Sequence, residues 1–207
     1  MRVTTSVATR NYKNMSKNYA KFDQERYDKF DGKAKNALIS YLEQEGHSIK
    51  NAVEDYHADV TSTRQGATYY SEAEVKTAWK EAWPKDWAEL RIPARKARLL
   101  KRHSIITFYV FRSDLKECWV VKGEQLTLDS LKEAYGPKIS KGEMFFHIPV
   151  KEAKLIRHDE NGWTEIVQED TAPQKTTTGA KNRKTKAVPE RTEDQPTDDS
   201  AGSSGNG

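Results

Sequence analysis

The sequence predicts a mixed α/β domain in which helices flank a central β-sheet. Three observations lead to this fold class. Residues 32–46 have helical periodicity and end at a glycine, residues 49–77 contain two extended segments around a polar turn, and residues 104–122 contain two segments rich in β-branched and aromatic side chains. Helical and extended segments that alternate in this way are typical of an α/β architecture.

Composition divides the 207 residues into three regions. Hydrophobic residues make up only 35% of the chain, and residues 168–207 contain no aromatic side chain. Such a segment buries too little apolar surface to offset its ordering entropy, so we expect a disordered polar tail at the C-terminus. We expect a basic, aromatic N-terminal arm over residues 1–30 and one folded domain over residues 31–167.

The first predicted helix covers residues 32–46. Leu38, Tyr41 and Leu42 fall on one face of this helix, and Gly46 is a typical helix stop. This face is expected to pack against the sheet.

Two strands are expected after this helix, over residues 49–63 and 67–77. The residues between them, Arg64-Gln65-Gly66, form a plausible hairpin turn. Side chains alternate along a strand, so the second strand places Glu72, Glu74 and Lys76 on one side and Val75 on the other.

The remaining elements are predicted from local composition. Pro93 is well placed in the first turn of a helix that runs to about residue 103. The expected order is helix, two strands, helix, two strands, helix, two strands, with the later elements at residues 104–112, 118–122, 127–135, 144–150 and 162–167.

The most informative feature is the convergence of Asp59, Glu74 and Lys76. Antiparallel pairing around the turn places Asp59 opposite Glu72 and diagonal to Glu74. Two neighbouring carboxylates repel each other unless a cation neutralises them, and their hard oxygen atoms suit Mg²⁺ or Mn²⁺. The same three residues are common on the solvent side of a strand, so the pattern gains weight from the helix, hairpin and basic helix around it.

These residues and their order resemble the PD-(D/E)XK nuclease superfamily, which has the restriction-endonuclease-like fold and includes Holliday-junction resolvases. The resemblance covers roughly residues 32–122 and is carried by Leu42 to Gly46, by Asp59-Val60 and by the triplet Glu74-Val75-Lys76. It implies that Asp59 and Glu74 are metal ligands, that the backbone carbonyl of Val75 is a further ligand, and that Lys76 is the catalytic cation. The implied cofactor is Mg²⁺ or Mn²⁺.

The sequence departs from this family at one position and leaves alternatives at others. Many resolvase-like relatives carry an acid early in the first helix, where this chain has Lys35. Glu45 is a potential substitute for that acid. Glu72 competes with Glu74 if the register shifts by two residues, and Asp55 is the nearest rival of Asp59.

Basic residues after the triplet indicate a nucleic-acid partner, most plausibly double-stranded or branched DNA. Trp79, Trp83 and Trp87 recur every four residues, which favours a helical core stripe over a wedge that stacks on bases. The predicted DNA-binding residues are Arg91, Arg95, Lys96, Arg98, Lys101 and Arg102, with Arg95 and Lys96 as the leading candidates.

The predicted function is therefore an Mg²⁺-dependent DNA endonuclease, with selectivity for junctions or branched DNA as a narrower option. The alternatives are a catalytically inactive nucleic-acid-binding module of the same fold and a protein-interaction scaffold. The single cysteine, Cys118, fits a reducing compartment such as the cytoplasm, although the basic N-terminus leaves organelle targeting as an alternative. No apolar segment is long enough for a membrane helix, and a homodimer would suit an enzyme that cuts both strands.

Overall fold

The computed structural model describes residues 23–51, 58–136 and 139–167. The predicted tail and most of the predicted N-terminal arm lie outside these residues. No helix in the described ranges is both long and apolar enough to cross a membrane. The elements are α2 (Gln24–Gln44), β1 (Ser48–Asn51), β2 (Val60–Arg64), β3 (Ala67–Lys76), β4 (Glu89–Pro93), η2 (Ala94–Lys96), α3 (Ala97–Arg102), β5 (Ile106–Arg112), β6 (Glu117–Lys122), η3 (Gly123–Gln125), β7 (Leu131–Glu133), β8 (Met144–Pro149), η4 (Val150–Glu152), β9 (Lys154–Asp159) and β10 (Gly162–Ile166).

The described strands form two sheets. A seven-stranded sheet has the order β1-β2-β3-β5-β6-β9-β10, and a three-stranded sheet has the order β4-β8-β7. Strands β3 and β5 run parallel, while the other pairs in both sheets are antiparallel. The chain returns from β3 to β5 through β4, η2 and α3, as a parallel pair requires a crossover connection. The predicted mixed α/β class is confirmed.

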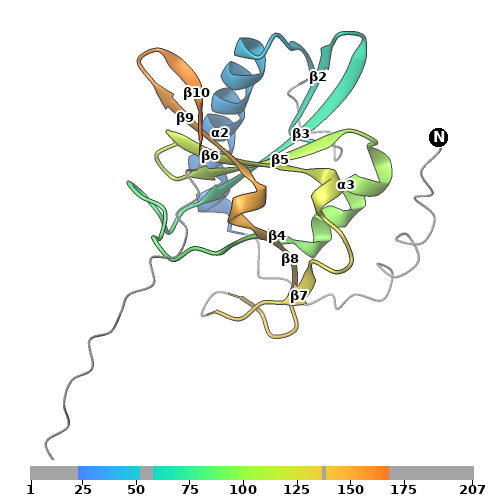
Figure 1. Cartoon of the computed structure of the whole chain (residues 1–207), viewed down its shortest axis with the longest axis vertical. Coiled ribbons are helices and arrows are strands. Elements are labelled where there is room, and N and C mark those ends of the chain that lie inside the picture. Colours follow the sequence, from blue (N-terminus) through green and yellow to red (C-terminus); the bar gives the residue numbers. More distant parts are fainter. Residues whose placement is uncertain (1–22, 52–57, 137–138, 168–207) are drawn as a thin grey trace, which may run out of the picture. The chain divides into compact units, whose positions relative to one another are not determined.

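Helix α2 lies on one face of the large sheet, and the small sheet and α3 lie on the other (Figure 1), so that two apolar cores form. On one face α2 contributes Leu38 and Leu42, which pack with Val60 and Phe111. On the other face the small sheet and α3 pack against a second set of strand residues, among them Phe108, Phe146 and Leu99. The hairpin β2–β3 therefore lies between α2 on one side and the η2–α3 segment on the other.

Helix α2 begins earlier than the sequence predicts. It starts at Gln24, so residues 24–30, which we assigned to the N-terminal arm, belong to the helix. The side chains of Gln24 and Asp28 form an exposed hydrogen bond of 2.7 Å. The first turns are mostly exposed and polar, and their apolar signal is limited to Tyr27 and Phe30, which are half-buried and three residues apart. The predicted stop is confirmed, because the helix ends at Gln44 and Gly46 takes a φ of 81°.

The segment predicted as one strand over residues 49–63 forms two. Strands β1 and β2 pair antiparallel with each other, and residues 52–57 between them lie outside the described part of the chain. A strand of fifteen residues would exceed the usual length of about 3–10 residues. The next strand is confirmed as β3, and the turn joining it to β2 places Gln65 and Gly66 at φ values of 50° and 78°.

The helix predicted over residues 127–135 is wrong. This region contains the short strand β7, which pairs with β8, and the Ala134 N–H donates to the Glu143 carbonyl. Leu131 of β7 pairs with Phe146, an apolar core residue on β8. This tertiary contact overrides the local helical preference. The sequence reading also omits β4 and β9. The predicted β5–β6 hairpin and the strands near residues 144–150 and 162–167 are confirmed.

Candidate functional site

The β2–β3 hairpin has the register that the sequence predicts. Val60 pairs with Ser71 and Arg64 pairs with Ala67. One step beyond Val60, Asp59 therefore lies opposite Glu72. The Asp59 Oδ2 atom accepts a hydrogen bond of 2.8 Å from the backbone N–H of Ala73, which holds the carboxylate at the start of β2. Both strands thus place an acid at the same end of the hairpin.

Strand β3 separates its functional and structural side chains by alternation. Ala73 and Val75 pack against the core beneath α2. Glu72, Glu74 and Lys76 point to the opposite face, toward η2 and β4, where their ion-pair and hydrogen-bond partners lie. We call Asp59, Glu72 and Glu74 the carboxylate row.

Each member of the carboxylate row faces a lysine. Glu74 Oε1 lies 2.5 Å from Lys76 Nζ, and Glu72, which is buried, pairs with Lys96 from η2. Asp59 Oδ1 lies 3.8 Å from Lys35 Nζ on α2. The three lysines come from three different elements. Lys35 on α2 and Lys96 on η2 approach from opposite faces of the sheet.

An acid from α2 joins the same network. Asp31 Oδ2 lies 2.9 Å from Lys35 Nζ, one helical turn away. The site therefore contains four carboxylates and three ammonium groups, counting Asp31, the carboxylate row and its lysine partners, which leaves a formal charge of −1. Lys35 itself is buried, so it is a component of this site and not a solvated charge.

Burial raises the pKa of the Asp59 carboxyl. The Ala73 N–H and the positive charges of Lys96 and Lys35 act in the opposite direction, whereas Asp31 adds to the increase. Lys96 is therefore close enough to Asp59 to act on its carboxylate as well as on Glu72. The Asp59 charge is stabilised by the Ala73 N–H and by these two lysines.

Lys76 has a second partner besides Glu74. Its Nζ atom donates a hydrogen bond of 3.0 Å to the backbone carbonyl of Arg91 on β4. This contact fixes the ammonium between β3 and β4, beside the carboxylate row. The three residues predicted to be catalytic thus lie toward the open end of the β2–β3 hairpin, with Asp59 just before β2 and with Glu74 and Lys76 at the end of β3.

The donor set of the row suits a hard divalent cation, because carboxylate oxygens are the ligands that Mg²⁺ and Mn²⁺ prefer. Among the residues that the structure describes, however, no group of three or more acids, histidines or cysteines is arranged to hold a metal ion. Each carboxylate of the row is paired with a lysine ammonium instead.

One of the predicted DNA-binding residues does not lie on the exposed surface. Lys96 was expected on the outer surface, but its side chain turns inward to Glu72 because that buried carboxylate requires a cation. Arg91 lies on β4 and is half-buried. The exposed basic surface, which we call the α3 surface, contains Arg95, Arg98, Lys101 and Arg102.

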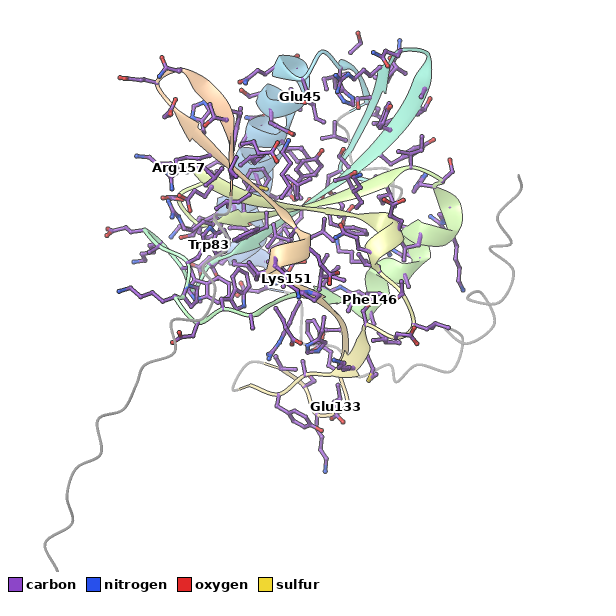
Figure 2. The ribbon with its side chains drawn as sticks, in the orientation of Figure 1. Glu45, Trp83, Glu133, Phe146, Lys151 and Arg157 are labelled. Carbon is purple, nitrogen blue, oxygen red and sulfur yellow. The ribbon has the colours of Figure 1, made fainter. Side chains whose placement is uncertain are left out.

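One alternative from the sequence lies away from the carboxylate row. Glu45 directly follows the last residue of α2 (Figure 2), and its Oε2 atom lies 3.8 Å from Nη1 of Arg64. Asp55 lies outside the described residues. Glu72, by contrast, belongs to the row together with Glu74.

The three tryptophans after β3 do not form a helix. They lie in the connection to β4, where Figure 2 labels Trp83, and they pack against one another. The ring centroids of Trp83 and Trp87 are 5.1 Å apart. Trp83 and Trp87 also pack against the core that the small sheet covers. The predicted helix through the three tryptophans is wrong, but Trp83 and Trp87 do pack against the core. This packing favours a structural role over a base-stacking wedge.

Sequence reasoning missed Asp31 and the inward position of Lys96. A signal for the first was available, because Lys35 falls on the apolar face of α2 between Ala34 and Leu38. A lysine on a buried helical face requires an acid nearby, and Asp31 is four residues away. No comparable signal exists for Lys96, whose partner is 24 residues distant.

The sequence matches no known family model and no curated protein.

Proposed function

We propose that this chain is an Mg²⁺-dependent DNA endonuclease with a restriction-endonuclease-like core. The carboxylate row beside Lys76 carries the proposal, because it joins metal-binding chemistry to a positioned cation at one end of a hairpin. The topology supports it as well. A helix precedes the hairpin, and the chain then crosses through α3 to β5, which is parallel to β3. This arrangement agrees with a mixed central sheet flanked by helices.

Asp59 and Glu74 are the proposed metal ligands, together with the backbone carbonyl of Val75. Glu72 is a further ligand in this proposal, because it lies opposite Asp59. When bound, Mg²⁺ would polarise a phosphoryl oxygen and lower the pKa of a coordinated water. Lys76 would orient the attacking water and stabilise the negative charge that develops on the phosphate. Its hydrogen bond to the Arg91 carbonyl preorganises the ammonium for this role.

The substrate class follows from the charges near the row. The α3 surface presents four exposed basic residues, of which Arg95 lies in the same turn as Lys96 and the other three lie on the helix that follows it. Contacts of this kind hold a phosphate backbone without reading its sequence. We therefore propose DNA as the substrate. Selectivity for branched DNA and assembly as a homodimer are narrower forms of this proposal.

Cleavage of supercoiled and branched DNA tests the proposal. The full chain should cut one of these substrates with Mg²⁺ or Mn²⁺, and a chelator should stop the reaction. Asp59→Asn and Lys76→Met should each lower the rate by at least about 100-fold, as expected for groups that stabilise the transition state. Glu45→Gln is the matched control, because it removes one acid from the described part of the chain away from the row and should cut normally. Parental rates for both site variants would refute the assignment.

One observation favours a second candidate, a nucleic-acid-binding module without turnover. Every carboxylate of the row has a lysine partner within the chain, so ion pairs alone explain why the acids are tolerated. This candidate predicts DNA binding that weakens with salt, persists with chelator and gives no cleavage with any divalent metal.

A further inference from the structure

Lys96 links the carboxylate row to the α3 surface. It is the last residue of η2, whose preceding residue is the exposed Arg95, and the basic helix α3 follows directly. Its backbone therefore belongs to the surface that would meet a phosphate backbone. Its ammonium, however, pairs with Glu72 inside the site.

The Lys96 ammonium places a positive charge next to the carboxylates that a bound metal ion would neutralise. It contacts the buried Glu72 carboxylate, and its charge partly opposes the increase that burial causes in the pKa of Asp59, which lies opposite Glu72 on the neighbouring strand. Neighbouring carboxylates repel each other unless a cation neutralises them or one of them takes up a proton. In the protein without nucleic acid, Lys96 supplies much of that charge.

A divalent cation and the Lys96 ammonium would compete for the same carboxylates. If both occupied the site, the cation would be repelled at short range in a poorly hydrated environment, where charge interactions are strong. The lysine side chain has four flexible methylene groups, so it can turn from Glu72 toward a phosphate without a change in the backbone. A phosphate on the α3 surface would offer that alternative partner.

We propose that Lys96 is an exchangeable cation that couples metal binding to nucleic-acid binding. In the free protein it holds Glu72 and keeps the affinity for metal low. When DNA binds, Lys96 pairs with a phosphate of the backbone, and the row becomes available to Mg²⁺. The inference rests on the proposed function, which it deepens by making the metal site dependent on the substrate. By linkage, the metal must strengthen DNA binding by the same factor.

Binding of Mn²⁺ to the full chain tests this coupling independently of cleavage. Free Mn²⁺ is measured by its electron paramagnetic resonance signal, with and without a phosphorothioate duplex that stays intact during the titration. For the parent protein the duplex should raise the Mn²⁺ affinity by at least about fivefold, within the range of about 5- to 150-fold found for allosteric coupling. An affinity that does not change with the duplex would overturn the proposal.

Three variants assign the coupling to Lys96. Lys96→Gln should bind Mn²⁺ at least about fivefold more tightly than the parent without the duplex, and the duplex should then add little. Lys96→Arg keeps the charge and the pair with Glu72, so its affinity without the duplex should stay as low as that of the parent. Arg98→Gln, an exposed change on the α3 surface, should weaken duplex binding but leave the coupling at saturating duplex intact.

The outcomes separate this inference from the proposed function. If Lys96→Gln binds Mn²⁺ as weakly as the parent, or if Lys96→Arg binds it as tightly as Lys96→Gln, the exchange is refuted while a metal site remains. If the parent binds no Mn²⁺ even with the duplex, both the exchange and the nuclease assignment fail. Thermal unfolding of each variant shows whether it is folded. If Lys96→Gln does not fold, the parent and Lys96→Arg still test the proposal. Because both carry a positive charge at position 96, the duplex must raise the Mn²⁺ affinity of both by the same factor.

Discussion

Replacing Lys35 with methionine removes the ammonium that α2 contributes to the site. The Lys35 Nζ atom lies 2.9 Å from Asp31 and 3.8 Å from Asp59, and its side chain is only 10% exposed. Methionine keeps most of the apolar length of the side chain, so the main loss is the charge. Two carboxylates would then remain near each other, and Asp59 would retain the Ala73 N–H and the charge of Lys96.

The expected loss of stability follows from the burial of this pair. Removing one partner of a buried ion pair costs about 3–5 kcal/mol. The Asp31 side chain is 26% exposed and can be solvated, and Asp59 keeps other partners, so the loss should lie at or just below the lower limit of this range. We expect a loss of about 2–3 kcal/mol in the free energy of unfolding. For a domain of this size that corresponds to a decrease of about 5–10 °C in the melting temperature.

Chemical denaturation of three variants measures this effect. Lys33→Met is the matched control, because Lys33 is exposed on the same helix and its loss should change stability by less than about 0.5 kcal/mol. In an Asp59→Asn background, Lys35→Met should cost less by about 1 kcal/mol, since the charge it compensates is gone. If Lys35→Met costs no more than Lys33→Met, or if the Asp59→Asn background leaves the cost unchanged, the proposed charge compensation is wrong.

Three further predictions concern the fold that supports the site. Glu117→Gln should destabilise the domain by about 3 kcal/mol in urea unfolding. The reason is that the buried Glu117 carboxylate accepts hydrogen bonds of 2.8 Å from both Arg112 and Arg157. A loss of stability below about 1 kcal/mol would contradict this role. Burial acts to raise the pKa of Asp114, but its hydrogen bonds with Arg112 and Lys116 bring it below the usual value, so its contribution to stability should be complete above about pH 4 and disappear as the pH falls further. Unfolding of Asp114→Asn should lack this part of the acid dependence, and an identical pH profile would count against it. Burial raises the pKa of the Cys118 thiol well above its usual value, so a thiol-specific reagent should label the protein only after unfolding, and rapid labelling of the native protein would disprove the buried position.

The hairpin and its register could be predicted from the sequence because both depend on local signals. A turn at Gln65-Gly66 fixes which residues pair, and strict alternation then determines the faces of Glu74 and Val75. The opposition of Asp59 and Glu72 follows from these two facts. Likewise, the apolar face of α2 and the stop at Gly46 are encoded within a few turns of the helix.

The ion pairs of the site could not be predicted in the same way. Lys96 belongs to a basic run that is typical of a solvated surface, and only the crossover from β3 to β5 brings its turn against Glu72. The strand β7 is a similar case, because its conformation depends on pairing with β8 and not on the local sequence. Contacts of this type depend on topology, which sequence periodicity does not specify.

The position of bound Mn²⁺ tests the central claim most directly. Crystals of the full chain with Mn²⁺ and an uncleaved duplex should give an anomalous density peak in contact with the Asp59 carboxylate and with Glu72 or Glu74. The same crystals should show Lys96 directed away from Glu72. A carboxylate row without Mn²⁺, with its lysine pairs intact beside bound DNA, would contradict a metal-dependent nuclease site.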